Sequence, residues 1–169
     1  MKLIETAIAG AYIVELEPHH DERGFFARTY SDDVFRELLP HIAQSNASFS
    51  DRRGTLRGLH YQRPPHGEAK LVRCTRGAIF DVIADLAVAQ WFGIELTQDD
   101  HRMLFIPEGI AHGFQTLVDA TEVSYYISRA YHPPSAAGAR WNDPVLGIRW
   151  PLEPTVMSER DRTWPELSR

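Results

Sequence analysis

The chain has 169 residues, a length that suits one domain with a substantial core. Its formal net charge is −5 at pH 7, which argues against a protein built to wrap nucleic acid. No apolar run approaches the length of a membrane span, and the N-terminus lacks a signal-peptide core. The single cysteine, Cys74, makes an internal disulfide impossible. We therefore expect a cytoplasmic protein without nucleic-acid or membrane partners.

Strand patterns begin near the N-terminus. Residues 4–16 read as one or two strands interrupted at Gly10, and residues 25–30 read as a further strand. Between them, residues 19–24 are expected to form a turn. Two adjacent histidines lie in that turn, and a solvated turn explains them better than a metal site does.

One short helix is expected in the N-terminal half of the chain. Ser31 is a suitable N-cap, and Asp32 and Asp33 in the first turn complement the helix dipole. An apolar face follows, and Pro40 ends the segment. The residues of that face are Val34, Phe35, Leu38 and Leu39. The sequence therefore predicts one amphipathic helix in this region.

Many short strands separated by turns occupy the middle of the chain. They are expected at residues 44–50, within 53–85, at 91–96 and 103–106, and at 122–128. Three Pro-containing segments then punctuate an irregular C-terminal tail, and no repeat or linker divides the chain. This pattern predicts a mainly β (all-β) fold, a jelly-roll β-sandwich, with residues 1–169 as a single cupin-like domain.

Polar residues cluster in the segment 53–85, which otherwise reads as strand. His60, Lys70, Arg57 and Arg73 all lie there among Leu, Val and Ile. Strand residues alternate between two faces, and an inward-facing charge needs a partner, a ligand or water. An outward or rim position explains any one of these residues alone. The whole set predicts a polar site.

Two histidine motifs resemble those of the cupin superfamily. Pro107-x-Gly109-x-x-His112 is similar to the second cupin motif, and Gly58-x-His60-x-Gln62 lies where the first would be. Metal cupins have a second histidine where this chain has Gln62, and the usual glutamate position is not clearly filled. Zinc and iron sites usually take three or more ligands, so the two histidines alone make a poor site. We expect no metal and no cofactor.

The same residues suit proton chemistry. His60 can take up a proton near neutral pH, and a buried carboxylate could orient it. Lys70 could stabilise negative charge that develops on a carbonyl oxygen. A tyrosine could donate a proton from the opposite side, and spacing alone does not choose among Tyr125, Tyr126 and Tyr131. Base, acid and oxyanion partner together describe proton abstraction next to a carbonyl.

Longer blocks of the sequence resemble one cupin family, the dTDP-4-dehydrorhamnose 3,5-epimerases of deoxysugar biosynthesis. The most specific blocks are Arg57-Gly-Leu-His-Tyr-Gln62 and Lys70-Leu-Val-Arg-Cys74, which occur in order and at the family's spacing. The resemblance covers nearly the whole chain. It also includes Asp21-Glu-Arg-Gly-Phe-Phe26, Gln44-x-Asn46-x-Ser48, Ile106-Pro-Glu-Gly-x-Ala-His-Gly-Phe114, Trp141-Asn-Asp-Pro144 and Ile148-x-Trp-Pro151.

This resemblance implies a metal-independent enzyme that inverts C3 and C5 of a dTDP-linked 4-keto-6-deoxyhexose. It makes His60 the base, paired with Asp161, and Tyr125 the acid on the other face of the sugar. Lys70 would steady the O4 oxyanion. The expected substrate-binding residues are Arg23, Phe26, Gln44, Asn46, Arg57 and His112, with Tyr131 stacked on the thymine.

The resemblance also implies a homodimer, in which strands of residues 1–30 could cross to the partner. Three features depart from the family: Arg28, the short connection between Asp85 and Trp91, and Arg160. Two other functions stay open from the residues themselves. They are a metal-dependent cupin oxygenase or isomerase, and a non-catalytic cupin that binds a sugar nucleotide.

Overall fold

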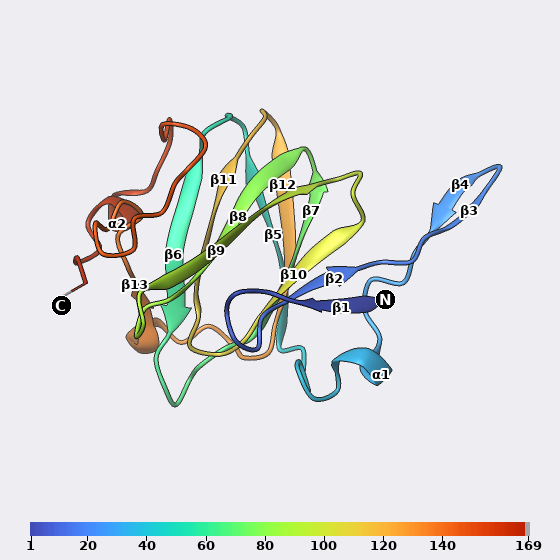
Figure 1. Cartoon of the computed structure of the whole chain (residues 1–169), viewed down its shortest axis with the longest axis horizontal. Helices are drawn as coiled ribbons and strands as arrows, with labels where there is room; N and C mark the ends of the chain where they lie inside the picture. Colours follow the sequence, from blue (N-terminus) through green and yellow to red (C-terminus); the bar gives the residue numbers. More distant parts are fainter. Residues whose placement is uncertain (168–169) are drawn as a thin grey trace.

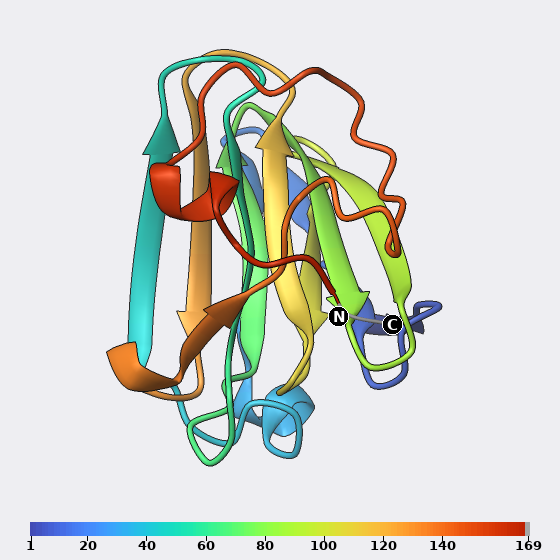
Figure 2. The same ribbon diagram turned by 90° about the vertical axis from the view of Figure 1, so that its left-hand side faces the viewer.

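Two antiparallel sheets face each other in the computed structural model, which describes residues 1–167 (Figures 1 and 2). The six-stranded sheet contains, in spatial order, β1 (Lys2–Glu5), β2 (Tyr12–Glu15), β10 (Arg102–Ile106), β7 (Lys70–Arg76), β12 (Thr121–Ile127) and β5 (Gln44–Ser50). The five-stranded sheet contains β13 (Ala136–Gly138), β6 (Leu56–Gln62), β11 (Ala111–Thr116), β8 (Ala78–Asp85) and β9 (Gln90–Thr97). This arrangement confirms the predicted β-sandwich.

The space between the sheets is filled by apolar side chains from both of them. Val72 and Leu104 come from the six-stranded sheet, and Ile83 and Phe114 from the five-stranded sheet. The strands β10 and β11 are buried along almost their whole length. They consequently lack the alternation of apolar and polar residues that marks a strand with one wet face.

Two other apolar clusters cover the outer faces of the sheets. Phe35 and Leu39, in and just after the N-terminal helix, pack against Leu71 outside the six-stranded sheet. Leu146 of the C-terminal tail packs outside the five-stranded sheet, against Val82. Both faces of each sheet therefore have apolar cover, and the tail is part of the core.

The expected helix is present but short. It forms α1 (Asp32–Phe35), with Ser31 at the N-cap, although the serine hydroxyl makes no capping hydrogen bond. The tail is largely irregular, as expected, but it contains β13 and a second helix, α2 (Glu159–Arg162). No helix within residues 1–167 is long and apolar enough to cross a membrane.

The segment of residues 19–30 differs from the expectation. His19–Asp21 is a strand (β3) rather than part of a turn, and it pairs with β4 (Gly24–Phe26). The second strand stops at Phe26, whereas residues 25–30 were expected to be extended. A lone hairpin lacks neighbours that would lengthen its strands. Every residue of both strands is exposed, and the hairpin projects as an arm from the sandwich (Figure 1).

Strands β6 and β11 approach closely at two glycines. The backbone of Gly58 has φ +127°, and a Cβ there would lie 2.5 Å from the Cα of Gly113 and 2.8 Å from the carbonyl oxygen of His112. The pairing register shifts at this place, between His112 and Phe114. The bulge brings His60 of β6 opposite His112 of β11.

We predict that Gly58→Ala lowers the free energy of unfolding by about 2–5 kcal/mol, from overpacking and a strained backbone. Urea denaturation measures this loss. Gly109→Ala is the control, because Gly109 also has positive φ but no atom lies within 4 Å of the position that a Cβ would take there. In Gly109→Ala the free energy of unfolding should fall by only about 1–2 kcal/mol. Equal losses in the two variants would contradict the close contact.

Candidate active site

A cavity of about 560 Å³ lies between the two sheets. Strands β5, β7 and β12 contribute from one sheet, and β6 and β11 from the other. Helix α2 and the loop after β12 complete the wall. The cavity brings together nine of the eleven predicted site residues: His60, Lys70, Tyr125, Asp161, Gln44, Asn46, Arg57, His112 and Tyr131.

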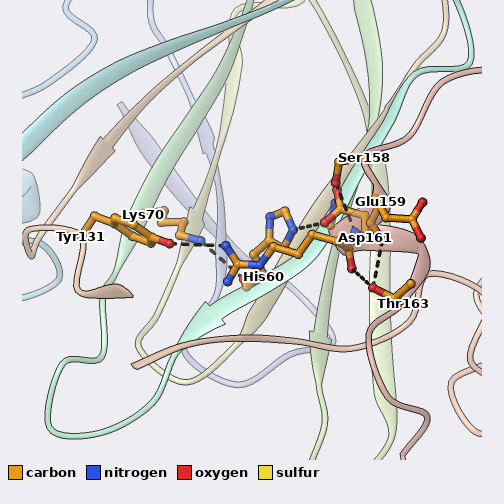
Figure 3. A network of polar contacts seen from close by, with 9 residues as sticks. His60, Lys70, Tyr131, Ser158, Glu159, Asp161 and Thr163 are labelled. Atoms are coloured by element: carbon orange, nitrogen blue, oxygen red, sulfur yellow. Dashed lines mark hydrogen bonds and ion pairs between the residues drawn. The ribbon is translucent and has the colours of Figure 1, made fainter. Parts of the chain in front are cut away.

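The shortest polar contact in this cavity joins His60 to Asp161. Nε2 of His60 donates to Oδ1 of Asp161 at 2.5 Å (Figure 3). The backbone N–H of Gly58 donates to Oδ2 of the same carboxylate at 3.3 Å. The His60 side chain is 42% exposed, whereas that of Asp161 is only 5% exposed. The carboxylate is therefore held from behind while the imidazole faces the cavity. In the neutral ring, Nδ1 is then the nitrogen that can accept a proton.

Two opposing effects act on the pKa of Asp161. Burial alone would raise it, but the hydrogen bond and positive charge of His60, with the N–H of Gly58, lower the pKa below its ordinary value. Asp161 is thus a carboxylate at neutral pH. Ser158 caps α2 by accepting from the backbone N–H of Asp161 at 3.1 Å, which fixes the carboxylate's position.

Lys70 is a buried cation on β7. Its Nζ lies 3.2 Å from Oε1 of Glu68 and 3.5 Å from the carbonyl oxygen of His60. The side chains of Lys70 and Glu68 are 11% and 9% exposed. A buried ammonium group beside the base can stabilise an oxyanion formed nearby.

Tyr125, not Tyr126, faces the cavity. Neighbouring strand residues point to opposite faces. Tyr126 packs on the outer face of the sheet, where its ring lies 6.0 Å from that of Tyr30. Burial raises the pKa of Tyr125, and the positive charge of Arg57 opposes part of that rise. The hydroxyl is therefore protonated at neutral pH and can donate a proton.

Polar side chains on β5 and β6 line the space beside Tyr125. Gln44 and Asn46 share one face of β5, and Asn46 is the cross-strand partner of Tyr125. Arg57 on β6 donates from Nη2 to the carbonyl oxygen of Phe49 at 3.0 Å. These amides and the guanidinium can bind the hydroxyl and phosphate groups of a ligand.

His112 forms a second histidine–aspartate pair behind the cavity. Its Nε2 lies 2.7 Å from Oδ1 of Asp81, a fully buried residue. His112 itself is also buried, unlike His60. The two histidines are cross-strand neighbours. The His60–Asp161 pair is open to the cavity, whereas the His112–Asp81 pair is buried more deeply.

Tyr131 lies at the mouth of the cavity with an exposed ring. Its backbone N–H donates to Oε1 of Gln44 at 2.8 Å, and its hydroxyl accepts from Nη1 of Arg160 at 3.3 Å. The guanidinium of Arg160 lies over the ring of Trp164, 4.8 Å from its centroid. An exposed aromatic ring in a fixed position can stack on a planar group.

Arg23 and Phe26 do not reach this cavity. Both belong to the projecting β3–β4 arm, where the guanidinium of Arg23 pairs with Asp21 and Phe26 is 68% exposed. Two of the predicted substrate-binding residues are therefore separated from the other nine within one chain.

Three charged residues that line the cavity were not predicted from the sequence to do so. They are Glu68, Arg129 and Arg160. Glu68 stands two residues before Lys70, a spacing that places side chains on the same face of an extended segment. That spacing was the available signal. Within residues 1–167, no three His, Cys, Asp or Glu side chains group as metal ligands, and the absence of a metal stays a prediction.

A jelly roll with a histidine–aspartate pair, a tyrosine and a buried lysine lining one cavity between its sheets defines a cupin-like protein. Comparison with known proteins identifies the family within this class. A family model described as dTDP-4-dehydrorhamnose 3,5-epimerase matches residues 5–169. The chain belongs to this family.

Individual relatives agree over almost the whole length. An epimerase of that name from Methanothermobacter thermautotrophicus is 45% identical, over 98% of this chain and 94% of its own. The Bacillus anthracis epimerase, solved with TDP and PPi bound, is 41% identical with a TM-score of 0.92, covering 98% of this chain and 99% of that one. The Legionella pneumophila epimerase, solved with dTDP-4-keto-L-rhamnose, is 36% identical with a TM-score of 0.91, covering 98% and 92%.

We predict that Asp161→Asn lowers kcat by about 10²–10⁴-fold, because the amide cannot stabilise the cationic form of His60. KM should change much less. Because the pKa of Asp161 lies below its ordinary value, wild-type kcat should show no acid limb from this group above about pH 4. Steady-state kinetics against pH measures both effects. Glu159→Gln, an exposed change on the same helix, is the control.

Proposed function

We propose that this protein inverts C3 and C5 of a dTDP-linked 4-keto-6-deoxyhexose, converting dTDP-4-dehydro-6-deoxyglucose to dTDP-4-dehydrorhamnose. The reaction needs no metal or cofactor, because the C4 carbonyl already acidifies the protons on both neighbouring carbons. The family supports this reaction, and the cavity holds the groups that it requires.

The observation that carries the proposal is the placement of base and acid on facing sheets. His60 lies on β6 of the five-stranded sheet, and Tyr125 lies on β12 of the six-stranded sheet. Both line the same cavity. A sugar ring bound between them would present one face to the base and the other face to the acid. Inversion requires this geometry, because the returning proton must arrive opposite the departing one.

The proton transfers then follow from the contacts. His60 removes the proton from C3, and the electron pair moves into the ring to place negative charge on O4. The ammonium group of Lys70 stabilises this enolate, and Asp161 stabilises the imidazolium. Tyr125 donates its proton to C3 from the other face. After each inversion His60 releases the proton that it took up, and Tyr125 regains one from solvent. The same sequence at C5 completes the second inversion.

The nucleotide binds at the mouth of the cavity. Tyr131 offers an exposed ring for stacking on thymine, and Arg57 offers positive charge for the diphosphate. Gln44, Asn46 and His112 hold the sugar. The structures of relatives with TDP and with dTDP-4-keto-L-rhamnose support a dTDP-linked substrate.

The protein acts as a homodimer in which the β3–β4 arm reaches the partner. Phe25 and Phe26 are 50% and 68% exposed on an arm that projects from its own sandwich. Exposed apolar residues on a hairpin that is joined to neither sheet mark an interaction surface. Arg23 and Phe26 of each chain then complete the cavity of the other. Residues 1–169 form one cupin-like domain apart from this exchange.

The first test of this function follows solvent deuterium. In D₂O the wild-type enzyme should incorporate deuterium at C3 and C5 of the 4-keto sugar nucleotide, and chelator should not change the rate. His60→Ala should lose exchange at both carbons by about 10²–10⁴-fold. Tyr125→Phe keeps the ring and should still exchange, while inversion falls much further than exchange. Mass spectrometry and NMR of recovered substrate and product measure the two rates.

Tyr126→Phe is the matched control, because that ring packs outside the cavity. Inversion at the wild-type rate by Tyr125→Phe would exclude Tyr125 as the acid. A wild-type protein without exchange would be a silent binder, and loss of exchange with chelator would favour a metal-dependent cupin.

A second test mixes two defective variants, Phe26→Ser and His60→Ala, under conditions that let subunits exchange. A mixed dimer contains one cavity with both defects and one with neither. The mixture should therefore regain about a quarter of wild-type activity when half of the dimers are mixed. An arm that served its own chain would restore nothing. Light scattering gives the oligomeric state, and a monomer at micromolar concentration would contradict the dimer.

A further inference from the structure

Glu68 is a buried acid that the proton transfers at C3 and C5 do not use. It lines the cavity, and its side chain is as deeply buried as that of Lys70. The residue between them, Ala69, packs into the opposite cluster outside the sheet, so Glu68 and Lys70 share the inner face. An extended backbone holds this arrangement, because Ala69 exchanges hydrogen bonds with Ser128.

We propose that Glu68 is a positioning residue that holds Lys70 charged and in place for the developing enolate. This inference rests on the proposed epimerase function. The Oε1 atom of Glu68 lies 3.2 Å from the ammonium nitrogen. The remaining contact of that nitrogen in residues 1–167 is the His60 carbonyl oxygen at 3.5 Å, the outer limit of hydrogen bonding. Glu68 is therefore the partner that fixes the ammonium group.

Burial makes this partner necessary. A buried amine favours its neutral form unless an opposite charge lies close to it. A neutral amine could not balance the charge on O4. An ammonium group has three N–H donors. One can point to the carbonyl oxygen of His60, while Glu68 pairs with the group by charge, which leaves N–H donors for the enolate oxygen.

A purely structural role explains the pair less well. A buried ion pair is weak evidence for stability, because apolar residues of similar size often serve as well. Here the pair is placed in a ligand cavity beside the base. Other titratable or charged groups line the same cavity from the elements around Lys70. They are His60, Arg57 and Tyr61 on β6, His112 on β11, Tyr125 on β12, Arg129 and Tyr131 beyond it, and Arg160 and Asp161 on α2.

The test measures deuterium exchange at C3 against pH in the Tyr125→Phe background, where the tyrosine hydroxyl cannot contribute to an alkaline limb. Glu68→Gln keeps the size and one acceptor but removes the charge. We expect the alkaline limb of exchange to move about one pH unit or more to lower pH, with a rate near pH 6 close to the parent's. Glu68→Ala should lower kcat about 10–100-fold with little change in KM, less than the loss of a whole oxyanion donor.

Glu108→Gln is the control. Glu108 is exposed in the loop between β10 and β11, where its side chain lies beside Gly67. This variant therefore makes the same charge change outside the cavity and should leave the limb in place. When Lys70 is already replaced by Met, this alkaline limb should be absent, and Glu68→Gln should not change the pH profile of exchange any further.

Four outcomes would overturn the proposal. They are an unmoved limb in Glu68→Gln, the same movement in the control, a movement that persists without Lys70, and variants that fail to fold, which would make the pair structural. Loss of exchange at all pH values in Glu68→Gln would instead make Glu68 a base, and would also overturn it. A wild-type protein that does not exchange C3 contradicts the epimerase function itself and is recognised before any Glu68 variant is measured.

Discussion

The hydrogen bond between His60 and Asp161 is the contact on which the rest of the site depends. It joins residues 101 positions apart, one on a strand of the five-stranded sheet and one on a helix of the tail. Asp161 is almost fully buried, so an unpaired carboxylate there would be costly. His60 and the backbone of Gly58 satisfy it together, and this ties the tail to the sheet at the wall of the cavity.

The sandwich divides the chemical roles between its layers. In the proposed mechanism one sheet holds the base and the other holds the acid and the ammonium group, so the apolar packing between the sheets sets the distance between them. Within each sheet, the pairing register fixes which side chains lie next to each other. His60 lies opposite His112, and Tyr125 lies opposite Asn46. A slip by one residue would turn each of these side chains out of the cavity, and the apolar clusters on both sides of the sheets oppose such a slip.

Local patterns in the sequence predicted most of the strands, the N-terminal helix and the motif residues of the cavity. They could not choose between Tyr125 and Tyr126 by alternation, because both faces of β12 are covered and neither side chain is fully exposed. The resemblance to the epimerases made that choice, and the structure places Tyr125 in the cavity. Glu68 was missed because its importance depends on a buried contact. Strand β3 was missed because a short exposed strand of polar residues lacks an apolar pattern.

The tail has a consequence for how the protein is made. His60 leaves the ribosome long before Asp161, since 101 positions separate them. At ordinary translation speeds this delay is about 5–20 seconds. During that time the outer face of the five-stranded sheet lacks Leu146 and its neighbours, and the base lacks its carboxylate. A chain released before residues 158–162 would therefore carry His60 without the carboxylate that the proposed mechanism requires.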